Sequence, residues 1–359
     1  MKRQLLFLTL MLMPLFALAD AVEIDGIYYN LNETDKTAEV TSNPNNYTGE
    51  INIPEKVKYN EVEYSVNRIG SSAFSYDIDL KSVSIPSSVT VISVMAFERC
   101  SSLTSVNISE GVTTISIAAF SGCIGLTSIT IPNSVKDISN SAFSSCSGLT
   151  SITIGNNVTS IGSSAFAGCS SLSSVTIPDS VTSIGISAFS GCSGLTSVTI
   201  GNNLSSIGHS AFNSCGNLAS VHISDLSAWC KITFNSSDSN PCSSAHHLFL
   251  NGEELTSITI PNDITEIKDY AFYGCSGLAS VSIPNSVTTI GNNAFADCTG
   301  LTSVHISDLS TWCRVSFSSS DSNPCSYAHR LFLNGEELSS ITIPNAITEI
   351  KNYAFFQCI

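Results

Sequence analysis

Apolar residues along most of the chain follow a pattern that repeats every 23 residues. In the unit from Leu126 to Gly148, Ile129 and Ile131 alternate with polar residues, which predicts a short strand with one buried face. Pro132 ends this strand because proline has no N–H for a strand ladder. The repeat is marked by an Ala-Phe pair at intervals of 23, with two longer intervals of 60, at Phe74, Phe97, Phe120, Phe143, Phe166, Phe189, Phe212, Phe272, Phe295 and Phe355.

The rest of the unit predicts a second strand and a turn. Val135 to Ile138 is a second short extended segment, and the closer spacing of Ala142, Phe143 and Cys146 is typical of a helical or 3₁₀ turn. One such coil cannot bury its own apolar residues, whereas stacked coils bury all of them. The sequence therefore predicts a β-rich solenoid of 23-residue coils, each with two short strands and a 3₁₀ or helical turn, with parallel sheets and little α-helix.

The motif Leu-x-x-Ile-x-Ile-Pro-x-x-Val-x-x-Ile-Gly-x-x-Ala-Phe-x-x-Cys resembles the BspA-like leucine-rich repeats, from about Ile51 to the end of the chain. The resemblance implies a leucine-rich-repeat solenoid on a secreted or cell-surface protein. It also implies adhesion to host matrix proteins, to host cells and to other bacteria. Asn157 and Asn203 fit the asparagine of better-known leucine-rich repeats, but Ser134 and Ser180 do not. The curvature of those proteins is therefore not expected.

Departures from the period divide the chain into segments. Lys2, Arg3 and the apolar run that follows, with Ala17 and Ala19 before a cleavage point, predict a signal peptide. We expect no membrane span once it is removed. The predicted segments are a signal peptide (1–19), an N-terminal cap region (20–66), regular repeats (67–221), a first long insert (222–259), regular repeats (260–304), a second long insert (305–342) and an incomplete last repeat (343–359).

The two ends of the predicted stack differ in how they are covered. Ile27–Leu31 and Thr37–Thr41 read as a hairpin within a cap that covers the first coil. The last repeat stops where the next strand would begin, so its apolar side chains and strand edges are left uncovered. We expect fraying of this coil, end-to-end association, or a truncated gene product.

The two long inserts are near copies of each other and hold the two tryptophans of the chain. Each contains an Asn-Gly pair, at Asn251 and Asn334, that predicts a hairpin turn. Insertions in repeat proteins often lie on the binding face, so Trp229 and Trp312 are candidates for ligand contacts. The alternative is that each indole packs beneath its own insert.

Most cysteines hold one position of the repeat. Stacked parallel side chains do not point at one another, so we expect nine buried free thiols, at Cys100, Cys123, Cys146, Cys169, Cys192, Cys215, Cys275, Cys298 and Cys358. The inserts add two local pairs, Cys230–Cys242 and Cys313–Cys325, which are either disulfides or buried free thiols. His246 or His329 would give each pair only a third zinc ligand, so we expect no metal and no cofactor.

Outward positions of the predicted strands form rows of hydroxyl side chains. Such a face could bind a protein or glycan through many weak hydrogen bonds, or it could be a solvated β surface. The candidate binding residues are Ser128, Thr130, Ser151, Thr153, Ser174 and Thr176.

The charge balance restricts the partners. The formal net charge is −15 with only 12% charged residues, so clustered Lys and Arg for nucleic acid or anionic lipid are lacking. Neither a phosphate-binding glycine loop nor a Gly-x-Ser-x-Gly elbow is found. We therefore expect a non-catalytic protein of the cell surface or medium that mediates protein–protein interaction or adhesion. The alternatives are a glycan-binding or glycan-hydrolysing accessory protein, which would use exposed Trp229 and Trp312, and a structural spacer in a larger surface protein.

Overall fold

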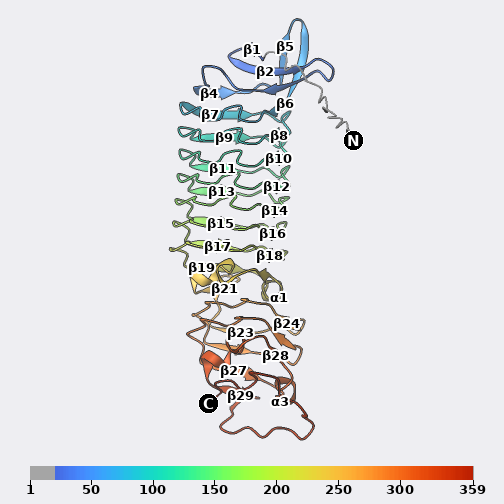
Figure 1. Ribbon diagram of the computed structural model, residues 1–359, viewed down its shortest axis with the longest axis vertical. Helices are drawn as coiled ribbons and strands as arrows, with labels where there is room; N and C mark the ends of the chain where they lie inside the picture. Colours follow the sequence, from blue (N-terminus) through green and yellow to red (C-terminus); the bar gives the residue numbers. More distant parts are fainter. Residues whose placement is uncertain (1–20, 359) are drawn as a thin grey trace, which may run out of the picture.

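The computed structural model describes residues 21–358 and shows an elongated stack of coils (Figure 1). The chain descends the stack one coil at a time, so neighbours in the sequence are neighbours in the stack. This confirms the predicted β-solenoid with parallel sheets and little helix. The predicted signal peptide at 1–19 lies outside the described residues.

The first strand of each coil forms one row along the stack. Its polar residues face solvent and its alternate apolar residues face inward, as in β11, where Ile129 is buried between exposed Ser128 and Thr130. The row consists of β4 (Gly49–Asn52), β7 (Leu80–Ile85), β9 (Ser105–Ile108), β11 (Ser128–Thr130), β13 (Ser151–Thr153), β15 (Ser174–Thr176), β17 (Ser197–Thr199), β19 (Ser220–Ile223), β21 (Leu248–Leu250), β23 (Ser257–Thr259), β25 (Ser280–Ser282), β27 (Ser303–Ile306) and β29 (Leu331–Leu333).

The second strands are only two residues long and form a second row. Each pairs in parallel with the equivalent strand one coil away, as Ile115 of β10 does with Ile138 of β12. After β6 (Val62–Ile69), the row consists of β8 (Val91–Ile92), β10 (Thr114–Ile115), β12 (Asp137–Ile138), β14 (Ser160–Ile161), β16 (Ser183–Ile184), β18 (Ser206–Ile207), β20 (Thr233–Phe234), β24 (Glu266–Ile267), β26 (Thr289–Ile290) and β28 (Ser316–Phe317).

The Ala-Phe pairs form the centre of the core. From Phe74 to Phe212, each ring stacks on the ring of the next coil, with centroids 4.7–5.4 Å apart. Leu126, Val135 and Phe143 are fully buried, as the repeat pattern predicts. Burial of apolar surface at about 25 cal/mol per Å² stabilises the stack along its whole length.

A small antiparallel sheet covers the first coil. It contains β1 (Val22–Ile24), β2 (Ile27–Asn32), β3 (Thr37–Val40) and β5 (Lys56–Tyr59), and it joins the second row through β6. β2 and β3 pair antiparallel, which confirms the predicted hairpin. β3 then pairs in parallel with β6, so the cap continues one sheet of the solenoid and leaves no open edge there.

The long inserts are coils of the stack and not bulges on its surface. In each, the second strand keeps its place in the second row, as β20 does beside β18. Short helices replace the tight corner of a regular coil. They are α1 (Leu226–Cys230), the 3₁₀ helix η1 (Ser237–Ser239) and α2 (Cys242–Ala245) in the first insert, and α3 (Leu309–Trp312), η2 (Ser320–Ser322) and α4 (Cys325–Ala328) in the second.

Each insert leads into a hairpin that interrupts the first row. β21 pairs antiparallel with β22 (Glu253–Glu254), and β29 does so with β30 (Glu336–Glu337). Asn251 and Gly252 both have positive φ, as the predicted Asn-Gly turn requires. New sheets begin at β23 and β24. We call the segment that runs from α1 to β23 the first joint. The equivalent segment that begins at α3 is the second joint.

The last coil is partly uncovered. Ile341 and Ile350 are 36% and 43% exposed, whereas their counterparts after the first insert, Ile258 and Ile267, are 3% and 0% exposed. The difference arises because the coil that contains Ile258 is covered by β25 of the next coil, with which β23 pairs. The exposed apolar side chains expected for this repeat are therefore present, while fraying and end-to-end association stay predictions.

Candidate functional site

The predicted hydroxyl rows are exposed and aligned. Ser128 lies opposite Ser151, and Thr130 lies opposite Thr153, in the parallel pair β11–β13. Ser174 and Thr176 continue the rows in β15 and are exposed as well. We call these six residues the hydroxyl face. Their side chains stand on the outer side of strands whose inner residues are buried in β11 and β15 and partly buried in β13, so the packed core holds the face in place.

The tryptophans do not contact solvent, which corrects their assignment as ligand-binding residues. Trp229 and Trp312 are each 1% exposed. The indole Nε1 of Trp229 donates a hydrogen bond of 3.0 Å to the carbonyl oxygen of Ala271, and Trp312 donates one of 2.8 Å to that of Ala354. An indole buried in this way cannot stack on a sugar ring, so the alternative of packing beneath the insert is the one observed.

The tryptophans replace a backbone donor that the inserts lack. In regular coils the Phe N–H donates to the Ala carbonyl of the next coil, as Phe120 does to Ala142 at 2.8 Å. The first insert has no Ala-Phe pair, so the Ala271 carbonyl accepts instead from Trp229 and, at 3.1 Å, from the Asn240 side chain. A buried carbonyl without a donor would cost about 1–3 kcal/mol. The Trp and Asn side chains therefore join the two stacks.

All thirteen cysteines are free thiols, and twelve of them are buried. In the regular coils each Sγ donates to the Phe carbonyl of the preceding coil, as Cys146 does to Phe120 at 3.1 Å. This bond explains why a cysteine recurs at the corner, where a small donor is needed in an apolar setting. Burial raises the pKa of the Cys146 thiol to about 12.

Of the two alternatives for the insert cysteines, disulfides or buried free thiols, the structure has the free thiols. Cys242 lies between Cys215 and Cys275 in the chain, and it occupies the cysteine row of its own coil. It forms a side-chain hydrogen bond with Cys275, which raises the pKa of the Cys275 thiol. Cys230 is a separate buried thiol at the end of α1. Cys313 and Cys325 are likewise free, and Cys325 lies beside Cys358.

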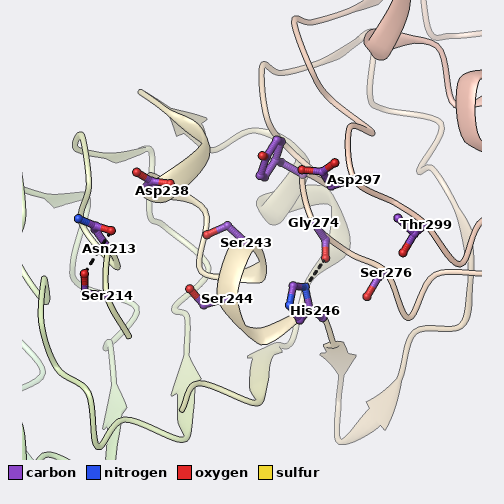
Figure 2. A pocket seen from close by; sticks show the side chains of 11 residues that line it. Asn213, Ser214, Asp238, Ser243, Ser244, His246, Gly274, Ser276, Asp297 and Thr299 are labelled. Atoms are coloured by element: carbon purple, nitrogen blue, oxygen red, sulfur yellow. Dashed lines mark hydrogen bonds between the residues drawn. The ribbon is translucent and has the colours of Figure 1, made fainter. Parts of the chain in front are cut away.

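A polar hollow of about 480 Å³ opens at the first joint (Figure 2). One side comes from η1 and α2, with Asp238, Ser243 and His246, and the other comes from the following coils, with Asp297 and Thr299. His246 Nδ1 lies 3.1 Å from the carbonyl oxygen of Gly274. Since a carbonyl only accepts, Nδ1 is the donor in this contact.

Tyr273 and Asp297 both line this hollow. A hydrogen bond to the Asp297 carboxylate, together with burial, raises the pKa of the Tyr273 phenol to about 12. The phenol therefore keeps its proton at neutral pH and stays uncharged beside the carboxylate. No group of three or more His, Cys, Asp or Glu residues in the part of the chain described by the structure is placed to share a metal ion.

Sequence reasoning did not find this hollow. Its residues come from four separate stretches of the chain, and serine and threonine are too common here to single out Ser243 or Thr299. One signal was available. Asp297 has a left-handed backbone at a corner position where most coils have glycine or serine, such as Gly168 and Gly191. A carboxylate at such a position is a departure from the repeat that marks this corner as special.

Between residues 21 and 358, we find no helix with the length and apolar character needed to cross a membrane. No curated protein sequence matches the chain significantly. Solved structures that are similar to it include the following two. A leucine-rich repeat protein from Bacteroides ovatus ATCC 8483 is 25% identical, with 88% of this chain and 89% of that chain covered and a TM-score of 0.49. A leucine rich cell surface protein from Faecalibacterium prausnitzii A2-165 is 28% identical, with 83% and 98% covered and a TM-score of 0.40.

The sequence profile of the family agrees with the repeat described above. The BspA type leucine rich repeat region matches residues 67–181, 160–240 and 242–359, in six copies. These matches cover the regular coils and both joints. The chain therefore belongs to the BspA-type leucine-rich-repeat family.

Proposed function

We propose that this chain is a non-catalytic binding protein of the cell surface or medium, and that it attaches to protein ligands through its hydroxyl face. The ligands we propose are host matrix proteins, host cell-surface proteins and proteins of other bacteria. The observation that carries the proposal is the in-register exposure of Ser128, Thr130, Ser151 and Thr153 on a fully packed core.

The physical argument rests on side-chain entropy and on hydrogen-bonding capacity. A hydroxyl group both donates and accepts, so a regular array of Ser and Thr can satisfy either kind of group on a partner. These short side chains lose little conformational freedom on binding, in contrast to Lys or Glu. Many individually weak bonds over a long, flat face suit an extended ligand better than a small one.

The thiol chemistry is compatible with export. Buried thiols with raised pKa values, such as that of Cys146, hold little thiolate at neutral pH, and thiolate is the form that oxidises. A cysteine-rich chain can therefore keep free thiols outside the cell. The basic residues Lys2 and Arg3 ahead of an apolar run support export through a signal peptide.

The test is to place charge on one face at a time. Thr130→Lys, Thr153→Lys and Thr176→Lys are combined in one variant, and Ser160→Lys, Ser183→Lys and Ser206→Lys in a matched variant of the second row. Binding of the mature protein to immobilised matrix proteins and to host and bacterial cells is then measured. We expect the first variant to bind at least about 10-fold more weakly and the second to bind like the parent.

Equal loss in both variants, or no loss in either, would rule out the hydroxyl face as the binding surface. If the parent protein binds none of these targets, the proposed attachment to protein ligands is wrong. Circular dichroism and thermal unfolding of each variant show whether the solenoid itself has been preserved.

A further inference from the structure

The hollow at the first joint is produced by a break in the corner ladder. In regular coils the corners are tied together by backbone bonds such as Gly191 N–H to Asn213 O. The last regular coil before the joint is bonded to it by the Phe212 N–H, which donates to the Asp238 carbonyl. After the joint, the regular pattern begins again with the Phe272 N–H, which donates to the Ala294 carbonyl. Between these points η1 and α2 take the place of the tight turn, and their side chains surround the open space (Figure 2).

The walls of the hollow are close-packed and cannot simply collapse. A Cβ added to Gly274, which has a φ of +74°, would lie 2.9 Å from Ser243 Cα and 3.0 Å from Cys242 O. On the same wall, Asn240 behind α2 is fully buried and donates to the carbonyls of Tyr270 and Ala271 at 2.8 and 3.1 Å. The hollow therefore has a fixed shape before any ligand arrives.

The groups that face this space are oxygen and nitrogen atoms suited to a ligand rich in hydroxyls. Asp238 and Asp297 supply carboxylate acceptors from opposite sides, and Ser243 and Thr299 supply hydroxyls that both donate and accept. The His246 ring is a further polar group in the lining. The Tyr273 ring adds an aromatic surface at the edge of the hollow.

We propose that the first joint binds carbohydrate, as one or two neutral or amino sugar rings of a glycan chain. A volume of about 480 Å³ lies within the size range of small-ligand sites. Sugar hydroxyls donate to the two carboxylates and exchange bonds with the serine and threonine hydroxyls, while an amino group pairs with Asp238 or Asp297. Anionic sugars are excluded because the carboxylates repel them and this hollow has no Lys or Arg.

A basic peptide is the alternative ligand for this hollow. The residues that line the hollow favour a sugar. A lysine or arginine side chain would use the carboxylates but would leave most of the hydroxyls without a role. This site is also independent of the hydroxyl face, because it uses different residues and lies at a different level of the stack. Failure of one proposal leaves the other standing.

The second joint provides matched controls within the same chain. Ser244, which lines the hollow, corresponds to Tyr327 of the second insert, and Asp238 corresponds to Asp321. Tyr273 and Gly274 correspond to Phe356 and Gln357. The backbone around Tyr327 is that of a helix, α4, like α2, so a tyrosine is compatible with this position. Ser244→Tyr therefore fills the hollow with a side chain that the fold already accepts elsewhere.

The experiment uses the mature chain on an array of oligosaccharides that end in glucose, galactose, mannose, N-acetylglucosamine or glucosamine, followed by titration calorimetry with the best binder. We expect a dissociation constant on the order of 10 µM to 1 mM, as a single polar site gives. Ser244→Tyr and Asp238→Asn each weaken binding at least about 10-fold, whereas Asp321→Asn leaves it unchanged. Thermal unfolding checks that each variant is folded.

Several results would overturn the proposal that the hollow binds sugar. A blank array with the folded parent protein overturns the proposal. So does an equal effect of Asp321→Asn, since that would make the effect one of overall charge, and so does full binding by Ser244→Tyr. Binding of a lysine- and arginine-rich peptide that requires Asp238, without any sugar binding, assigns the hollow to basic peptides instead. Thr130→Lys, Thr153→Lys and Thr176→Lys together should leave sugar binding intact.

Discussion

Trp229 and Ala271 are 42 residues apart, yet the indole of the first donates directly to the carbonyl of the second at 3.0 Å. The same bond recurs between Trp312 and Ala354 at 2.8 Å. Neighbouring regular coils are joined by backbone hydrogen bonds. At the inserts the backbone donor is missing, and a tryptophan side chain donates instead. This relationship makes the inserts structural joints.

The first prediction concerns this bond. Trp229→Phe keeps an aromatic ring but removes one of the two donors to the Ala271 carbonyl, and we expect it to lower the free energy of unfolding by about 0.5–1.5 kcal/mol. Denaturant unfolding gives the change, and hydrogen exchange should show it concentrated in the coil that contains Ala271. A variant as stable as the parent, with unchanged exchange there, would show that the indole N–H is not needed at the joint.

The second prediction concerns the stacked phenylalanines. Phe143→Ala leaves a cavity in the middle of the ring stack, so the free energy of unfolding should fall by about 3–5 kcal/mol. Ile186→Ala is the control, because its side chain is among the exposed large apolar residues, and it should change stability by less than about 0.5 kcal/mol. Similar losses in both variants would contradict the burial order described here.

The third prediction concerns the thiols. At pH 8 a thiol reagent should label Cys358 first, since a hydrogen bond from Cys325 lowers its pKa, while buried thiols such as Cys146 stay protonated. Cys358→Ala should remove the fast phase. After unfolding without reductant, mass spectrometry should find thirteen labelled cysteines. A lower number, in particular two missing pairs, would mean that disulfides form in the isolated protein.

The fourth prediction is a pH dependence at the first coil, where Asp77 replaces the repeat cysteine. Burial raises the pKa of Asp77 from 3.8 to about 6, so the folded state disfavours the carboxylate. The contribution is favourable below pH 3.8 and is lost as the pH rises through about 6. Compared with the parent, Asp77→Asn should be more stable at pH 7, on the order of 1–3 kcal/mol, with little difference at pH 4. Parallel stability curves from pH 4 to 7 would contradict this.

The repeat and its core could be predicted from the sequence because the same pattern of apolar residues recurs in coil after coil. Residues equivalent to Phe143 and Cys146 recur at the same spacing in the regular coils, so one consistent environment explains all the copies. The same regularity predicted the outward hydroxyls at Ser128 and Thr130. These features are local, in the sense that each coil meets only its neighbours.

The inserts were harder because their partners lie outside the period. Nothing close to Trp229 in the sequence indicates that Ala271 needs a donor, and Cys242 looked like a partner for Cys230 because the two are near in the chain. The spacings of Cys242 from Cys215 and from Cys275 both differ from the 23-residue repeat, so spacing did not place it in the cysteine row. The sugar hollow depends on four segments that meet only in the folded stack, so no local pattern encodes it.

The recurrence of the joint further along the stack has a consequence for how such a protein changes in length. Each joint bonds only to the coil before it and the coil after it, through groups that the unit carries with it. A whole unit could therefore be duplicated or deleted by recombination without creating an unmatched boundary. Descendants of one gene would then differ in reach by fixed steps, while every boundary that remained would keep its original partners.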